Sequence, residues 1–369
     1  MVQFILANTG GALGPASGSM PVTGGGADPY TGSAATAARP AAPQGPLVPL
    51  RGAVTFDSPP PAEGLAKKLR EFAAGPASGT LTPEEVEGTL VPLVQRLCSG
   101  RQGPPVGAAE SGVLERMLTW PPECLFPVFD LLRLLALSAE GAVFLASRAE
   151  AMLRSLDSAL DASRAQAPAL QTGLRLVANL FRQPALAQHA LQHAISLLGL
   201  LGSACGRVGM GGDKGKQTRL ALATVLLNYS AAWLAAGQPE QQVLDAKTQV
   251  VALLTELLQS CPSGDADTLV RAITAAGTAC WGSRETKDLA RDLSLVETVR
   301  GIVPGCPDSR VKQVSQGATK GRGWLHLPTR DGPPTVLQAG QEFLDVMRTE
   351  QQIQQEQPAP QMDDDDLYN

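Results

Sequence analysis

The chain has 369 residues, which is long enough for two or three domains or for one domain with long flexible arms, and 44% of them are hydrophobic, which is enough for a sizeable core. Only 4% are aromatic, and alanine and leucine dominate the middle of the chain, which favours helices packed on helices over a β-sandwich. The formal net charge of −5 argues against a general nucleic-acid binder.

The cysteines and the first residues indicate the cellular compartment. The six cysteines are widely scattered and form no Cys-x-x-Cys pair, so we expect reduced, buried thiols and neither a zinc site nor a disulfide framework. The start, MVQFILANTGG, has no basic region followed by a long apolar stretch, and no window approaches about eighteen uninterrupted apolar residues. We therefore expect a cytoplasmic and nuclear protein with no membrane insertion.

Ordered structure is expected to begin near residue 54. Residues 10–49 are mostly Gly, Pro, Ala and Ser, which bury too little surface to offset the entropy of ordering, so this segment is predicted to be a linker. Order begins with AVTFD, at Val54–Asp57. A helix is predicted in the following AEGLAKKLREFAAG, with Gly75 as its stop and one face formed by Leu65, Leu69 and Phe72.

Helices then continue to about residue 310. TPEEV predicts a helix start, with Thr82 as N-cap, Pro83 at the first helical position and Glu85 closing a capping box. Between Leu114 and about Arg310 one amphipathic or apolar helix follows another, and no strand-like alternation competes. The sequence therefore predicts an all-α fold.

Four of these helices can be aligned as repeats: DLLRLLALS, GLRLVANLF, ALATVLLNYS and VRAITAAGTAC. Their marker residues Arg133, Asn179, Asn228 and Gly277 are 46, 49 and 49 residues apart. Armadillo and HEAT repeats have periods of roughly 40–47 residues. We therefore predict an armadillo-like helical repeat array, with an ordinary helical bundle as the alternative.

Two asparagines interrupt the apolar runs of these helices, Asn179 and Asn228. A buried amide without partners would cost about 1–3 kcal/mol, so each side chain needs hydrogen-bond partners. On a concave groove, each amide could offer a donor and an acceptor to the main chain of an extended peptide. Alternatively, both could bond to the ends of neighbouring helices, and the sequence favours neither interpretation.

Several stretches resemble the PUL domain of phospholipase A2-activating protein, a ubiquitin-linked cofactor of the hexameric AAA ATPase valosin-containing protein. They are AVTFD…LAKKLREF, FPVFDLLRLLAL, LRLVANLF, LALATVLLNYSAAW and VRAITAAGTA. QFILANTGG and GGGADPYTGS resemble the last part of that family's ubiquitin-binding PFU module. Ubiquitin is therefore an expected partner only if the missing PFU portion is present. The family's WD40 propeller is absent from this sequence. The resemblance predicts a PFU remnant and linker at 1–48, a PUL domain at 49–310, and an irregular segment, short helix and acidic tail at 311–369, with both arms disordered.

The resemblance also implies a function, because the family's PUL domain is an armadillo-like array whose basic concave groove holds the acidic C-terminal tail of the ATPase. We therefore expect a non-enzymatic adaptor in ubiquitin-dependent protein turnover, with a generic scaffold for another acidic peptide as the alternative. Charge-assisted contacts are roughly twice as strong as neutral ones, so cations should line the groove, although each arginine could instead be solvated or paired with a nearby Glu. The predicted groove residues are Arg133, Arg175, Asn179, Lys214, Lys216, Asn228 and Arg271, with Arg133 and Arg271 ranked highest because they interrupt apolar helices.

The sequence departs from the family after Val311, where KQVSQGATKGRGWLHLPTRDGPP is polar and glycine-rich. A further helical pattern, from Val336 to about Gln352, contains Leu337, Phe343, Leu344 and Met347. The chain ends in MDDDDLYN, which by default is a solvated acidic tail. Because the family's ligand is itself an acidic tail with Leu and Tyr, this end is also a candidate self-ligand that competes in cis, formed by Asp363, Asp364, Asp365, Asp366, Leu367 and Tyr368.

The sequence contains no recognisable catalytic motif. GLLGSACG is not Gly-x-Ser-x-Gly, and GMGGDKGKQ lacks the glycine spacing and the Ser or Thr of a phosphate loop. His189 and His193 lie at i and i+4, but no Glu follows His189 in the zincin manner and no third ligand is apparent. We predict a protein with no catalytic residues, no metal, no cofactor and no nucleic-acid partner.

Overall fold

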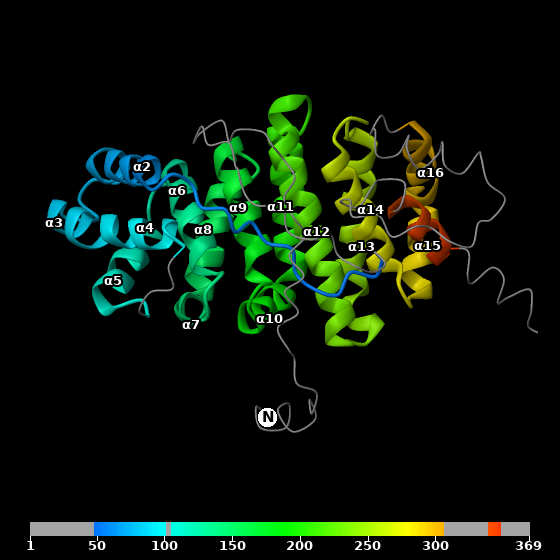
Figure 1. Cartoon of the computed structure of the whole chain (residues 1–369), viewed down its shortest axis with the longest axis horizontal. Helices are drawn as coiled ribbons and strands as arrows, with labels where there is room; N and C mark the ends of the chain where they lie inside the picture. Colours follow the sequence, from blue (N-terminus) through cyan, green and yellow to red (C-terminus); the bar gives the residue numbers. More distant parts are fainter. Residues whose placement is uncertain (1–47, 101–104, 306–338, 348–369) are drawn as a thin grey trace, which may run out of the picture.

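The computed structural model describes residues 48–100, 105–305 and 339–347. Within these ranges the secondary structure is helical and no β-strand occurs, which confirms the all-α prediction. The helices stack one after another along the long axis of the molecule (Figure 1). Most of the predicted linker, the segment 311–338 and the acidic tail with Asp363–Tyr368 lie outside the described residues.

The N-terminal end of the array begins and ends its helices where the sequence predicted. The Gly75 N–H bonds to the Phe72 carbonyl as the first helix ends, and Thr82 and Glu85 form the capping box of the next. Leu65 and Leu69 are buried. The helical stretch that begins at this capping box continues without a break to Cys98 and contains one π-helical turn. The elements are α2 (Ala62–Ala74), α3 (Pro83–Glu85), η1 (Val86–Leu90), α4 (Val91–Cys98) and α5 (Ala108–Met117).

The rest of the array is built from longer helices, of which α6, α9, α12 and α14 pack side by side in succession. We call these four the inner helices. The remaining bounds are η2 (Pro122–Cys124), α6 (Phe126–Leu135), α7 (Ala139–Ser147), α8 (Ala149–Leu160), α9 (Ala167–Leu180), α10 (Pro184–Gln192), α11 (Ala194–Val208), η3 (Asp213–Gly215), α12 (Lys216–Ala236), α13 (Glu240–Ser260), α14 (Ala266–Cys280), α15 (Arg284–Asp292) and α16 (Leu295–Gly305).

The repeat period predicted from the sequence recurs in the hydrogen bonds. Several side-chain hydrogen bonds between successive repeats span 42 to 50 residues, close to the predicted spacing, and those that span 46 include the pairs Leu137–Gln183, Arg219–Asp265 and Glu240–Thr286. Such regular cross-repeat contacts are expected when each repeat contacts chiefly its neighbours.

The core is centred on α12, in which every side chain from Thr218 to Ala231 is buried. The segment Asp213–Ala236 is long and apolar enough to cross a membrane, but 78% of its apolar window is buried inside the array, as in a core helix. The predicted late helix is present as residues 339–347, and its Phe343 and Met347 side chains are buried in the same core.

Free thiols also lie in this core. The described cysteines are free thiols: Cys124, Cys205 and Cys280 are buried, as predicted, whereas Cys98 and Cys261 are half-buried. Burial raises the pKa of Cys205 and of Cys280 to about 12, so both thiols are protonated at neutral pH.

Candidate peptide-binding face

An extended segment of the chain crosses all four inner helices. Residues 48–58, which we call the strap, run from α14 to α6, opposite to the order of the helices in the chain (Figure 1). Gly277 of α14 allows the closest approach, because a Cβ there would lie 2.8 Å from a methyl carbon of Val48. The linker prediction therefore ended too late: residues 48 and 49 belong to the strap and are described.

Two asparagines hold the main chain of the strap. The Val54 N–H donates to Asn228 Oδ1, and Asn228 Nδ2 donates back to the Val54 carbonyl, both at 2.8 Å. Asn179 bonds to Phe56 in the same way, at 2.7 and 3.0 Å. Each amide group therefore grips both main-chain groups of one strap residue.

Each Asn amide also bonds to the preceding inner helix. Asn228 Nδ2 donates to the Ala178 carbonyl at 2.9 Å, and Asn179 Nδ2 donates to the Arg133 carbonyl at 3.0 Å. Both interpretations of these asparagines are therefore realised together: they bind extended main chain, and they bond to a neighbouring helix. The extended chain they bind in this structure is the protein's own.

Arg133 continues this row of contacts beyond Asn179. Its Nη1 donates to the carbonyls of Phe56 at 2.9 Å and Ser58 at 3.2 Å, and its Nε donates to Asp130 at 2.5 Å. The side chain is only 3% exposed. Its charge is therefore balanced by Asp130 and directed at strap carbonyls.

Phe56 is the side chain that brings the other two predicted arginines together. The guanidinium groups of Arg175 and Arg271 lie over its ring, 5.5 and 5.8 Å from the ring centroid, which is cation–π distance. Arg271 Nη1 also donates to Thr224 Oγ1 at 2.5 Å. Burial lowers the pKa of Arg271 to about 10, so it stays charged at neutral pH.

The other end of the strap is held near α14. The Leu50 N–H donates to Thr278 Oγ1 at 3.1 Å, and the Val48 N–H donates to Glu342 Oε2 at 2.7 Å. Sequence reasoning missed Phe56, Thr278 and Glu342 as strap contacts. The alternation of Val54 and Phe56 was the available signal for an extended segment with one buried face.

Lys214 and Lys216 do not join this cluster. Both are exposed, in η3 and at the first position of α12, and neither makes a hydrogen bond or ion pair with the described strap residues. Arg219, beside them in the sequence, is buried: it pairs with Asp265 at 2.9 Å and donates to the carbonyls of Met210 and Gly212. The predicted groove residues therefore fall into two separate groups.

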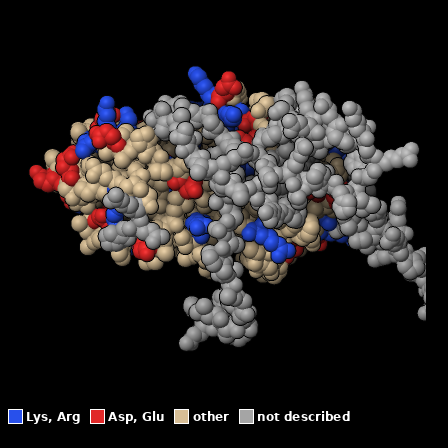
Figure 2. Space-filling view, viewed as in Figure 1, with Lys and Arg blue, Asp and Glu red and all other residues tan. Residues whose placement is uncertain are grey.

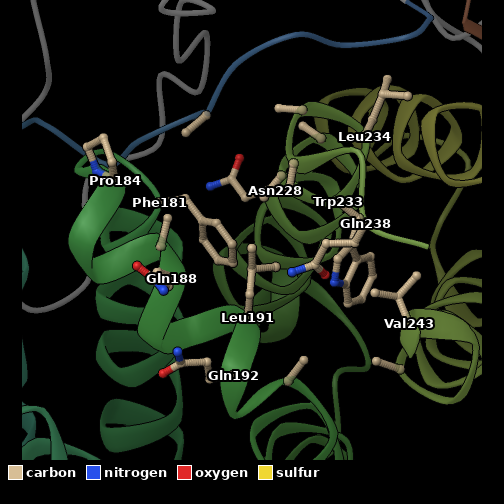
Figure 3. Close-up of a pocket in the computed structure, with 18 of the residues that line it drawn as sticks. Phe181, Pro184, Gln188, Leu191, Gln192, Asn228, Trp233, Leu234, Gln238 and Val243 are labelled. Carbon is tan, nitrogen blue, oxygen red and sulfur yellow. The ribbon is translucent and has the colours of Figure 1, made fainter. Parts of the chain in front are cut away.

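An open hollow lies next to Asn228 and the strap (Figure 3). Its volume is about 1290 Å³, and it is bounded by α10, the start of α11, the end of α12, the start of α13 and strap residues 50–53. Its lining includes the apolar side chains of Phe181, Leu191, Trp233 and Val243 and the amide side chains of Gln188, Gln192, Gln238 and Gln242. The charged or chargeable side chains among its described lining are Arg51 and His193, and none of the lining residues is a carboxylate.

The far end of the array has a different surface. Figure 2 shows acidic and basic side chains interspersed over α2 to α5, without a patch of one sign in this view. Ion pairs explain part of this pattern: Arg70 lies 2.6 Å from Glu87, and Arg116 lies 2.5 Å from Glu85. The hollow, whose described lining has no carboxylate, is therefore the better candidate for an acidic ligand.

Among the described residues, no group of three or more His, Cys, Asp and Glu side chains is placed to hold a metal ion. His193 instead lies 3.6 Å from Glu150.

Comparison with known families agrees with this geometry. The PUL domain model matches residues 48–316, which include the strap and every inner helix. The search of curated proteins found no match. The PUL domain is a helical protein-interaction module and not a known catalytic domain. Since the match covers most of the sequence, the chain belongs to the PUL domain family.

Proposed function

We propose that this protein is a non-enzymatic adaptor that binds the acidic C-terminal tail of a AAA ATPase of the valosin-containing protein type. The family match supports the class of partner, because PUL domains bind partners of this type. The role includes ubiquitin-dependent protein turnover and ubiquitin homeostasis in the cytoplasm and nucleus, as in phospholipase A2-activating protein. Ubiquitin itself is a partner only when a complete PFU module is present.

The observation that best supports this proposal is the chemistry of the concave face. The inner helices hold an extended chain by its main-chain groups, through Asn179 and Asn228. Next to that chain, the described lining of the hollow consists of apolar and amide groups together with Arg51 and His193 and contains no carboxylate. An acidic peptide with apolar anchors would meet the charge of Arg51 and the apolar surface there, and its main chain would meet the Gln amide groups of the lining.

A peptide titration tests the proposal. Fluorescence anisotropy would be measured with a labelled peptide ending in Asp-Asp-Asp-Asp-Leu-Tyr and with two control peptides, one with Asn for each Asp and one with Ala-Ala for Leu-Tyr. We expect saturable binding of the first peptide that weakens as salt rises, because ions screen charge attraction. Equal binding of the acidic and the Asn peptide would refute the proposal. Equal binding of the acidic and the Ala-Ala peptide would point to a scaffold for acidic peptides in general.

The chain's own tail belongs in the same titration, because Asp363–Tyr368 has the same sequence as the end of the acidic peptide. Competition in cis predicts tighter binding after residues 363–369 are deleted, since a tethered ligand has an effective concentration of up to about millimolar. Unchanged affinity would show that the tail does not compete.

A further inference from the structure

The strap has two edges, and only one of them faces the inner helices. In an extended chain, successive residues direct their N–H and C=O groups to opposite sides. The main-chain groups of Val54, Phe56 and Ser58 are bound by Asn228, Asn179 and Arg133. The intervening residues, Ala53, Thr55 and Asp57, therefore direct their main-chain groups to the opposite edge.

This second edge is unpaired in the described part of the chain. The N–H and C=O groups of Ala53, Thr55 and Asp57 make no hydrogen bond with any described residue. Ala53 and Thr55 are half-buried and Asp57 is exposed, so the edge is not sealed by the core. An accessible strand edge with unpaired main-chain groups is a template on which a second extended chain can pair.

The hollow adjoins the same part of the strap. Residues 50–53 form part of its boundary, so a chain paired with the free edge could place a side chain among Phe181, Leu191 and Trp233. Arg51, which is exposed, is at the same boundary. The absence of carboxylates from the described lining favours an acidic occupant over a basic one.

We propose that the acidic partner peptide binds as a β-strand on the free edge of the strap, at Ala53 and Thr55, with an apolar side chain in the hollow and a carboxylate at Arg51. The identity of the peptide rests on the proposed function; the inference adds how the peptide is recognised. The strap is the template for the partner, and the inner helices hold the strap.

The state of the strap favours this mode over displacement of the strap by the partner. Val54 and Phe56 are buried, and Asn179 and Asn228 are saturated by their contacts with the strap and the preceding helices. Displacing the strap would uncover both apolar side chains and break these contacts, whereas pairing on the free edge breaks none of them.

Proline substitutions separate the two edges. Thr55→Pro removes an N–H from the free edge only, while an extended backbone tolerates the proline φ and the preceding residue stays extended. We expect at least about a tenfold loss of affinity for the acidic peptide, with an unchanged thermal unfolding midpoint. Thr55→Val, which keeps the N–H, should bind as the wild type does. Val54→Pro is the matched control, because it removes the N–H that Asn228 accepts and should lower the unfolding midpoint.

A second measurement uses the unaltered protein, in case Thr55→Pro fails to fold. N-methyl groups would be placed at successive residues of the acidic peptide, one peptide at a time. Pairing on a strand edge predicts that affinity falls at every second residue only, because alternate N–H groups face the strap. Losses without this alternation, or wild-type affinity of a folded Thr55→Pro variant, would overturn the inference.

Arg51 gives an independent electrostatic test. Arg51→Gln should weaken acidic-peptide binding about threefold and reduce its salt dependence, whereas Arg182→Gln, at an exposed arginine outside the lining of the hollow, should not. Equal effects of the two substitutions would contradict the placement of the peptide.

The outcomes distinguish the two proposals. If the unaltered protein binds the acidic and Asn peptides equally, the proposed function has failed. If it binds them differently but the Thr55→Pro variant keeps the wild-type affinity, only this inference has failed.

Discussion

The row of polar residues under the strap, which we call the ladder, and the hollow beside it lie on one face of the array. Their polar side chains differ in burial and in hydrogen bonding. The ladder, formed by Arg133, Asn179, Asn228 and Arg271, is buried and bound to the strap or to neighbouring helices. The hollow is open, and Gln188, Gln192 and Gln238 on its rim are exposed. Polar residues in the middle of apolar helices therefore bind the strap and the neighbouring helices here, and the proposed partner site is formed by other residues, around the hollow.

This comparison predicts that ladder substitutions act mainly on stability. The largest effect is expected for Arg133→Glu, which places a carboxylate next to Asp130 and opposite the carbonyls of Phe56 and Ser58. Breaking a buried ion pair costs about 3–5 kcal/mol, so the free energy of unfolding in urea should fall by at least that range. Any loss of peptide binding in this variant would then accompany a loss of stability.

Arg182→Glu is the matched control, because Arg182 is exposed in the turn that follows α9, three residues after Asn179. Its free energy of unfolding should change by less than about 0.5 kcal/mol. An Arg133→Glu variant of wild-type stability that has lost only peptide binding would show that Arg133 belongs to the partner site.

A smaller loss is expected for Asn228→Ala. The substitution removes three hydrogen bonds and leaves the Val54 N–H and C=O groups buried without partners. Each unsatisfied buried group costs about 1–3 kcal/mol, so the loss of partners for these two groups should lower the free energy of unfolding by at least about 2 kcal/mol. Gln192→Ala, at an exposed amide of the hollow, should be near neutral in the same urea titration. Equal losses for the two variants would show that the strap contact contributes little.

Thr278→Val measures one hydrogen bond between the strap and α14. The hydroxyl accepts from the Leu50 N–H at 3.1 Å and donates to the Thr274 carbonyl within its own helix. Valine has the same shape without the hydroxyl, so the loss should be about 1 kcal/mol. Thr248→Val is the matched control, because its hydroxyl bonds only to the Leu244 carbonyl four residues earlier. A loss no larger than that of the control would place the stabilising contacts of the strap elsewhere.

The sequence predicted the ladder because a polar residue inside an apolar helix must find a partner, and the regular spacing placed those residues in one row. It could not tell whose main chain they bind. Lys214 and Lys216 were predicted to line the groove because they lie just before the predicted helix that contains Asn228. Lys216, however, lies twelve residues before Asn228 on α12, which is roughly 18 Å along its axis. The hollow was missed because its lining comes from separate helices and has no periodic pattern of its own.

The smallest effect on stability and a clear effect on binding should come from Ile195→Asp in the hollow. Ile195 is 52% exposed, so its replacement removes little packing and should change the free energy of unfolding by less than about 0.5 kcal/mol. The new carboxylate would repel an acidic peptide in a hollow that otherwise lacks carboxylates, and affinity in the anisotropy titration should fall several-fold, less so at high salt. Val143→Asp is the matched control, because Val143 is 73% exposed on α7 and does not line the hollow, so this variant should bind as the wild type does. If Ile195→Asp also binds as the wild type does, the peptide does not use the hollow, and the assignment of stability to the ladder and of peptide binding to the hollow is wrong.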